Sequence, residues 1–225
     1  MKVTARSIPS SGYYLLMLTL LNTGLLVFSC QGHSADSSIV SVNDIHQNDV
    51  ADYHYEPDPS IGNGIYRAAV HFANTVVWRY DPAYYRIPYP NGDVPSGGAC
   101  TDVVIRVLRK NQLDLQQSIH EDMTAYFSSY PRKWGLSVPD ANIDHRRVPN
   151  IMKYFERKGY GKNINNNQAD YQPGDIVCWE LSPGVTHIGI VLDNGNVFHN
   201  MGPASRIDSG FLFSYTIIGH YRVPL

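Results

Sequence analysis

The sequence is short of charge and of cysteine, and both shortages narrow what the protein can be. Charged residues make up 17% of the 225 residues, the formal net charge is −2, and no stretch carries five or six like charges. The charge distribution therefore gives no sign of a partner that is recognised mainly by its charge, such as nucleic acid. The three cysteines include no pair at the short spacing typical of structural zinc sites. A chain of this length suits one compact domain whose partner is chosen at a local site.

The N-terminus carries the features of an export signal. Lys2 and Arg6 precede an apolar run over residues 13–28, which is rather short for a membrane span. We therefore expect a signal peptide over residues 1–29, with an uncleaved anchor as an alternative. The mature protein is then expected outside the cytoplasm, in the cell envelope or periplasm.

The residues after this run indicate how the protein is held there. The small Ser29 stands directly before Cys30, as in a bacterial lipoprotein signal, so Cys30 is the expected lipidation site; simple secretion is the alternative. Residues 30–56 are polar and rich in Ser, Asp, Asn and His, which predicts a tether that carries the domain away from a membrane. A single folded domain is expected over residues 57–225.

Helical patterns come first in the chain and strand patterns come last. Apolar residues recur at helical spacing, and short β-rich runs bounded by turn residues follow them. The helix over 118–131 is expected to begin with a capping box formed by Ser118 and Glu121. The expected helices lie within 65–77, 100–110, 118–131 and 150–161, and the expected strands within 174–181, 187–192, 196–200 and 215–223. This order indicates an α+β fold with an antiparallel C-terminal sheet.

Cys100 lies between a glycine-rich turn and the first turn of a helix, in "PSGGACTDVVIRVLRK". Unpaired N–H groups and the helix dipole favour a thiolate there, which suits a nucleophile. Asp102 argues the other way, because its charge would repel a thiolate; its side chain could instead cap the helix or bind a group elsewhere. A disulfide with Cys178 and a buried structural thiol are the other interpretations, although Cys178 itself fits a buried strand position. This stretch alone leaves the choice open.

A base for such a nucleophile is available in "THIGIVLDNGNVFHN". Strand alternation places His187 opposite the apolar face of its strand. A two-residue hairpin loop would pair His199 with Ile190 and put the two histidines on opposite faces. A three-residue loop pairs His199 with Gly189 and puts both imidazoles on one face. Only the second register lets His199 orient His187.

These motifs together resemble known families. "YQPGDIVCWEL", "HIGIVLDNG" and "FHN" resemble the NlpC-type branch of papain-like cell-wall peptidases. With "ACTD", "HEDM", "NIDHRRVPN" and "GHYR" added, the set resembles the YijF-like family of bacterial proteins, whose function is unassigned. The resemblance implies a papain-like α+β fold with Cys100 as nucleophile, His187 as base and His199 as the orienting residue. It also implies an oxyanion-stabilising tyrosine, for which Tyr89, eleven residues before the cysteine, is the candidate.

The resemblance implies an exported cysteine hydrolase that cleaves an amide bond, with peptidoglycan stem peptides as the expected substrate and no metal or cofactor. Arg146 and Arg147 could receive substrate carboxylates, although "DHRR" could equally form a structural ion-pair knot. Ala99 and Asp102 depart from the branch, which carries an acidic residue before the cysteine and a neutral one at the second position after it. This departure puts substrate choice in question and makes Asp102 a candidate substrate contact.

Three other functions share the same residues. A non-catalytic module of the cell envelope would keep the constellation without turnover. An acyltransferase would use the same thioester chemistry with an acceptor other than water. A zinc site is the third, and it would use Cys100, Cys178, His187 and His199 as ligands.

Overall fold

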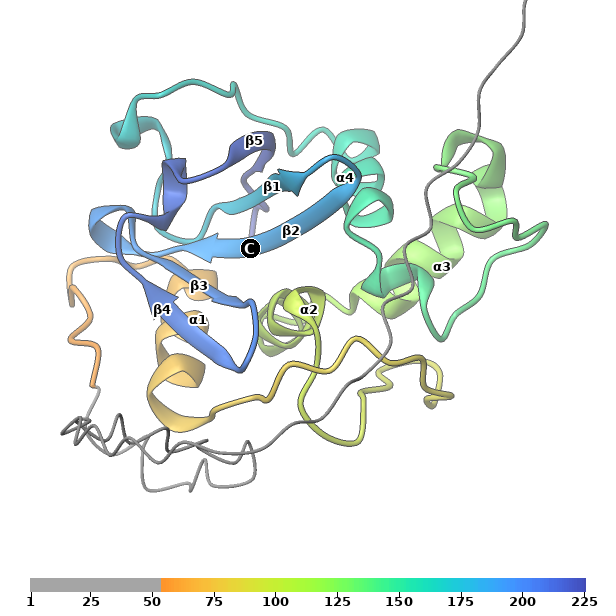
Figure 1. Ribbon diagram of the computed structural model, residues 1–225, viewed down its shortest axis with the longest axis horizontal. Helices are drawn as coiled ribbons and strands as arrows, with labels where there is room; N and C mark the ends of the chain where they lie inside the picture. Colours follow the sequence, from red (N-terminus) through yellow and green to blue (C-terminus); the bar gives the residue numbers. More distant parts are fainter. Residues whose placement is uncertain (1–53) are drawn as a thin grey trace, which may run out of the picture. The chain divides into compact units, whose positions relative to one another are not determined.

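The computed structural model describes residues 54–225 and confirms the α+β organisation, with helices first and an antiparallel sheet last (Figure 1). The expected signal peptide, Cys30 and residues 30–53 of the expected tether lie outside the described residues. Within the described range, the α-helices span Gly64–Thr75 (α1), Cys100–Lys110 (α2), Leu115–Tyr126 (α3) and Val148–Arg157 (α4). The strands span Ile176–Ser182 (β1), Val185–Val191 (β2), Val197–Asn200 (β3), Ser205–Asp208 (β4) and Thr216–Tyr221 (β5).

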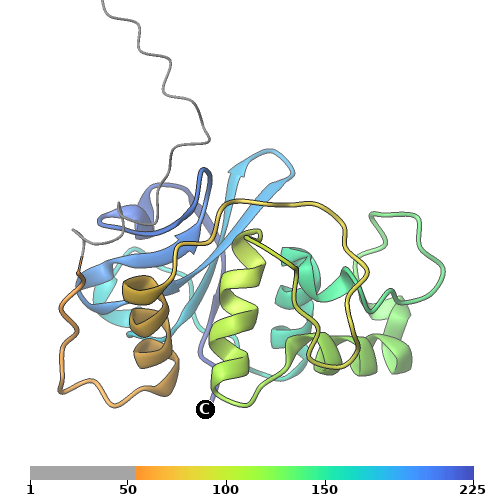
Figure 2. The ribbon, with the colours of Figure 1, turned by 90° about the horizontal axis from the view of Figure 1, so that it is seen from below.

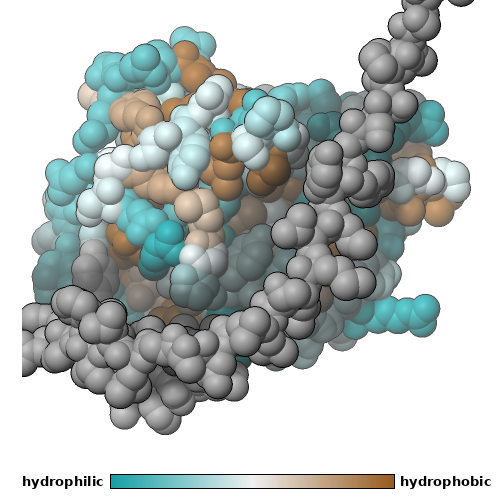
Figure 3. All heavy atoms as spheres, viewed as in Figure 1, coloured by the Kyte–Doolittle hydropathy of each residue, from teal (hydrophilic) through white to brown (hydrophobic). Residues whose placement is uncertain are grey.

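The sheet separates two apolar layers. Its strand order is β4-β3-β2-β1-β5, and each neighbouring pair is antiparallel. Alternate residues of β1 point to opposite sides: Cys178 joins the core under the helices, while Trp179 joins a smaller cluster on the other face. Figure 2 shows α1 and α2 side by side against the sheet. Figure 3 shows hydrophobic residues scattered among hydrophilic ones on one face. Among residues 54–225, no helix has the length and apolar character needed to cross a membrane.

Helix α2 places Cys100 in its first turn. The Asp102 carboxylate accepts a 2.6 Å hydrogen bond from the backbone N–H of Ala99, which closes the N-terminus. The next turns bury a valine-rich face that includes Val103 and Val107, both with no exposed surface. Arg109 and Lys110 occupy the last turn, where cations are stabilised by the helix dipole. The expected helix over 100–110 is therefore confirmed.

Helix α3 begins earlier than its sequence pattern indicated. The expected capping box of Ser118 and Glu121 does not form, because Asp114 caps the helix by accepting a hydrogen bond from the backbone N–H of Gln116. Glu121 instead accepts a 2.8 Å hydrogen bond from the side chain of Gln117, one turn before it. The earlier start lets Leu115 join the core under the sheet, with no exposed surface. Burial of one more apolar side chain thus favours the earlier start, and the helix ends at Tyr126, before the expected end at residue 131.

Candidate active site

The β2–β3 hairpin adopts the register that brings the two histidines together. Gly189 pairs with His199, as the three-residue loop Asp193–Gly195 requires. His187 Nε2 lies 2.7 Å from His199 Nδ1, and both rings are buried. A Cβ atom at Gly189 would lie 3.1 Å from the Cβ of His199 and 2.8 Å from a methyl of Val197, so glycine is needed for this packing. The register that places both imidazoles on one face is therefore the one that forms.

The hydrogen-bond chain continues to an aspartate that the sequence analysis missed. His199 Nε2 lies 2.9 Å from Asp208 Oδ2, and Arg206 Nε lies 2.9 Å from each oxygen of the same carboxylate. Both residues belong to β4, where Arg206 pairs with His199. The four residues of β4 carry too little strand pattern to be recognised alone; only pairing with β3 defines them.

The start of helix α2 meets the sheet where the pairing of β2 with β3 ends. The last pair is Gly189–His199, and β3 continues beyond it to Asn200. The side chain of Asn200 donates a 2.8 Å hydrogen bond to the carbonyl of Gly98, which holds the turn before Cys100 at this opening. The backbone N–H of Ile188, the residue after His187, acts on the Cys100 sulfur. The structure thus brings the thiol to the backbone of β2, at the residue that follows His187.

Burial dominates the electrostatics of these groups. It raises the pKa of the Cys100 thiol to about 11, an effect that backbone N–H groups oppose and that the charge of Asp102 reinforces. Burial also lowers the pKa of His187 to about 3, with His199 adding to the shift, and it lowers the pKa of His199. The resting site near neutral pH therefore holds a protonated thiol and two neutral imidazoles. The thiolate expected at the helix N-terminus is not the resting form, because burial outweighs the helix effect.

An aromatic cover lies over the histidines. The ring of Phe211 lies 4.3 Å from the His199 ring and 5.8 Å from the His187 ring, measured between centroids. The indole Nε1 of Trp179 donates a 2.9 Å hydrogen bond to the backbone carbonyl of Leu212, which fixes this segment on the sheet. The cover excludes water from the imidazoles on this face and strengthens the electrostatic interactions among them.

Asp102 and Arg146 form a buried ion pair beneath the Cys100 turn. Arg146 Nε and Nη2 each lie 2.9 Å from the Asp102 carboxylate, and both side chains are almost fully buried. Arg146 Nη1 also donates a 2.6 Å hydrogen bond to the carbonyl of Ala83. Both side chains are held by this pair, and Arg146 also lines the cavity at Cys100, so the substrate contacts expected of the two residues stay predictions. The pair ties the start of α2 to the segments of Arg146 and Ala83, and the ion pair within "DHRR" itself is the one between Asp144 and Arg147.

The structure also relocates the candidate tyrosine. Tyr89 packs edge-on against the His120 ring, 5.1 Å away, and does not line the cavity at Cys100. Tyr80 lines that cavity, and a backbone bridge to Gly98 holds it there. Burial and the neighbouring Cys100 raise the pKa of the Tyr80 phenol. Spacing along the chain pointed to Tyr89 because it carries no information about this bridge.

A cavity of 320 Å³ opens beside Cys100. Arg147 lines it, with its guanidinium 4.1 Å from the centre of the Trp134 ring and its Nη1 2.8 Å from Asp144 Oδ1. Lys133 lines it as well. Both arginines predicted to receive carboxylates therefore line the cavity, Arg147 beside Trp134 and Arg146 from its ion pair with Asp102.

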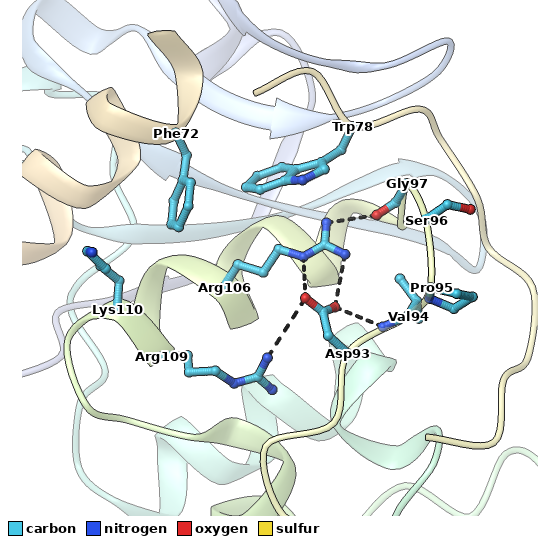
Figure 4. Close-up of a pocket in the computed structure, with 10 residues that line it drawn as sticks. All are labelled: Phe72, Trp78, Asp93, Val94, Pro95, Ser96, Gly97, Arg106, Arg109 and Lys110. Carbon is cyan, nitrogen blue, oxygen red and sulfur yellow. Dashed lines mark hydrogen bonds and ion pairs between the residues drawn. The ribbon is translucent and has the colours of Figure 1, made fainter. Parts of the chain in front are cut away.

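A larger cavity of 650 Å³ lies between Phe72 of α1 and the later turns of α2, and Cys100 does not line it (Figure 4). Its central cation, Arg106, is held by both oxygens of Asp93 at 2.8 and 2.9 Å. The same guanidinium lies 4.6 Å from the centre of the Trp78 ring. These contacts neutralise and fix Arg106, and the cavity contains neither histidine nor cysteine.

The cysteines do not form the alternative sites. Cys100 and Cys178 are free thiols, so the disulfide interpretation is not supported. Within residues 54–225, no group of three or more His, Cys, Asp or Glu side chains is placed to hold a metal ion. The four residues of the zinc alternative are therefore not arranged as ligands: Cys178 lies in the core under the helices, while His187 and His199 bond to each other on the opposite face.

Comparison with known proteins identifies the family. Residues 67–223 match a domain of unknown function, DUF1287. The chain belongs to this family. It is also 49% identical over 150 residues to the uncharacterized protein YijF of Escherichia coli (strain K12), a match that covers 64% of this chain and 73% of YijF. The resemblance to the YijF-like family is thus confirmed.

Two solved structures from Trichomonas vaginalis show a more distant likeness. NlpC1 superimposes with a TM-score of 0.43 and NlpC2 with 0.41, each at 15% sequence identity. Each match covers 75% of this chain, which spans about half the length of each of these proteins, 47% and 49% respectively.

Proposed function

We propose that this protein is an exported cysteine hydrolase that cleaves an amide bond in peptidoglycan stem peptides. The observation that carries the proposal is that the Cys100 sulfur meets the backbone of Ile188, the residue after His187, and that His187 is hydrogen-bonded to His199 at 2.7 Å. A thiol, an imidazole base and a group that orients the base are the parts that nucleophilic acyl transfer needs. Cell-envelope localisation and a lipid anchor at Cys30 belong to the same proposal.

The reaction begins from a neutral pair. His187 Nε2 is occupied by His199, so Nδ1 is the nitrogen that takes the proton from the Cys100 thiol. The resulting thiolate attacks the amide carbonyl carbon, and the protonated imidazole then gives its proton to the leaving amine. Water, activated by the same imidazole, hydrolyses the thioester and releases the carboxylate. Because burial disfavours both charged forms, we expect the proton to move only once substrate has entered the cavity.

The negative oxygen formed during attack has donors beside the sulfur. The backbone N–H of Cys100 belongs to the first turn of α2 and has no partner within the helix. Tyr80 lines the same cavity, and its hydroxyl takes in this proposal the role that the resemblance assigned to Tyr89. Each donor of this kind contributes about 3 kcal/mol to the stability of the transition state. Arg147 and Lys133 in the cavity wall would attract the carboxylates of a stem peptide.

Digestion of purified peptidoglycan tests the proposal. The full chain is compared with Cys100→Ala and with the matched control Cys178→Ala, and the released fragments are analysed by mass spectrometry. We expect new amine and carboxyl ends with the wild type and with Cys178→Ala, and none with Cys100→Ala. Identical fragment profiles for all three proteins would refute the hydrolase. Binding of peptidoglycan without any new ends would favour the non-catalytic module, and a new amide would favour acyl transfer.

A further inference from the structure

A carboxylate that the sequence analysis did not single out lies at the end of the histidine chain. Asp208 Oδ2 lies 2.9 Å from His199 Nε2, and His199 Nδ1 lies 2.7 Å from His187 Nε2. We propose that Asp208 is a positioning residue that fixes the tautomers of both histidines, so that His187 presents an unprotonated Nδ1 as the base for Cys100. Its use in catalysis rests on the proposed function, whereas the tautomers can be tested without a substrate.

The tautomers of His199 and His187 follow from the ionised carboxylate of Asp208, which can accept hydrogen bonds but cannot donate them. An ionised carboxylate has no proton to donate, so His199 must donate from Nε2 to Asp208. A neutral imidazole has a single N–H, and His199 Nδ1 therefore carries a lone pair. The 2.7 Å contact then requires His187 to donate from Nε2, which leaves its lone pair on Nδ1. The direction of each hydrogen bond in the chain is thus set from the Asp208 end.

Arg206 keeps Asp208 ionised. Its Nε lies 2.9 Å from both carboxylate oxygens, and its Nη1 donates to the carbonyls of Met201 and Gly202 at 3.0 and 2.8 Å. Burial would raise the pKa of Asp208, but the hydrogen bonds from Arg206 and His199 hold it below its usual value. The arginine is anchored by backbone groups, so the carboxylate keeps one orientation toward His199.

The same chain stabilises the charge that forms on the base. When His187 Nδ1 takes the proton, the S–H bond of Cys100 breaks, its electron pair stays on sulfur, and the ring becomes an imidazolium. The Asp208 carboxylate stabilises this positive charge through the His199 ring, while Arg206 opposes it from the far side of the carboxylate. The proton stays on His187, and none has to move on to His199 or Asp208.

The tautomers can be measured directly by long-range 1H–15N NMR on the full chain carrying Cys30→Ser. Near neutral pH, we expect His187 and His199 each to be protonated at Nε2 and unprotonated at Nδ1. The isosteric variant Asp208→Asn should reverse the direction of the hydrogen bonds that link residue 208, His199 and His187. Arg206 will hold the amide oxygen, so the amide N–H group faces His199 Nε2 and forces the proton of each ring onto Nδ1. The rate of Cys100 alkylation by iodoacetamide should then fall by about tenfold or more.

Two further variants keep the test independent of folding. Asp208→Leu removes the acceptor and should mix the tautomers, whereas Asp208→Glu should restore both the wild-type tautomers and at least part of the alkylation rate. Asp175→Asn alters the matched carboxylate bound to His220 and should leave the His187 signals unchanged.

A wild-type His187 protonated at Nδ1 would overturn the proposal, as would an unchanged His187 tautomer in both folded Asn and Leu variants. Failure to cleave peptidoglycan would refute the proposed function and leave the positioning role of Asp208 standing, because the NMR signals report the tautomers whether or not any bond is cleaved.

Discussion

The sheet carries two Asp–His–Arg clusters that share their chemistry and differ in where they lead. In the first, Asp208 binds His199 and Arg206 on the β3–β4 side of the sheet. The second nitrogen of His199 meets another imidazole, His187, and the backbone of the next residue, Ile188, meets the Cys100 sulfur. This cluster therefore ends at a group that can exchange a proton.

The second cluster ends in the backbone. Asp175 lies 2.7 Å from His220 Nε2 and accepts 2.7 Å hydrogen bonds from both Nε and Nη2 of Arg222. The other nitrogen of His220 lies 3.0 Å from the carbonyl oxygen of Asn163, and its ring stacks on Tyr171. A carbonyl cannot take part in proton exchange, so this cluster joins loop, strand and C-terminal segment without chemical function.

Burial separates the clusters as clearly as connectivity does. The Asp175 side chain is 1% exposed, whereas that of Asp208 is 29% exposed. The comparison teaches that two histidine motifs of the same composition differ in the group at the far nitrogen, and that in this chain "PGD" and "GHYR" supply the cluster that ends in the backbone.

The largest effect expected from this comparison is on stability. Asp175→Leu leaves Arg222 and His220 without their buried partner and should lower the free energy of unfolding by about 3–5 kcal/mol. Asp208→Leu breaks a partly exposed pair and should lower it by about 1 kcal/mol. Urea unfolding measures both. Equal losses would show that the two clusters do not differ in structural role.

The buried Asp102–Arg146 pair should behave like the structural cluster. Each single change, Asp102→Leu or Arg146→Leu, leaves the other charge buried without its partner. Each should therefore lower the free energy of unfolding by about 3–5 kcal/mol. The double variant removes both charges, so its loss should be smaller than the sum of the two. A strictly additive double variant, measured by the same urea unfolding, would contradict a direct pairing.

Acid should destabilise the protein partly through His187. Its pKa is about 3 in the folded chain and near 6.5 when unfolded, so the unfolded chain binds the extra proton between these values. Stability should therefore fall as the pH is lowered from about 6.5 toward 3. His187→Gln should reduce the slope by about 1.4 kcal/mol per pH unit. Unfolding curves measured at pH values across this window test this, and equal slopes in both proteins would contradict it.

A smaller effect should follow from Gly189→Ala. The added methyl would press on His199 and Val197 and should lower the free energy of unfolding by about 1–3 kcal/mol while displacing the His199 ring. Gly62→Ala is the matched control, because a methyl there meets nothing within 4 Å. Thermal unfolding and the His199 NMR signals measure the two effects. A Gly189→Ala variant with unchanged thermal stability and unchanged His199 signals would argue against the tight hairpin packing.

Local patterns predicted the elements and the histidine pair because both depend on neighbours along the chain. The spacing of apolar residues defined α2, and the sequence limited His187 and His199 to two registers, of which the structure adopts the one with the three-residue loop. The remaining site residues depend on contacts between distant segments. Asp208 is defined by the pairing of β4 with β3, and Tyr80 by its bridge to Gly98.

Polar residues show the same limit. Asp102 and Arg146 are 44 residues apart, and nothing in either local sequence shows that each is the partner of the other. Asp114 and Ser118 are both good helix caps, and the choice between them was decided by the burial of Leu115 in the core. A sequence pattern therefore indicated which residues are chemically able to act, and tertiary contacts decided which of them do.

The most direct test of the account is the alkylation rate of Cys100 by iodoacetamide, followed by mass spectrometry of its peptide in the full chain and in His187→Ala. The account holds that His187 is the base that ionises a thiol otherwise kept protonated by burial. It predicts that the rate near neutral pH falls by about tenfold or more in His187→Ala. It also predicts that the rate stays within about twofold of wild type in His220→Ala, provided that this variant folds. Equal rates in wild type and His187→Ala would contradict it.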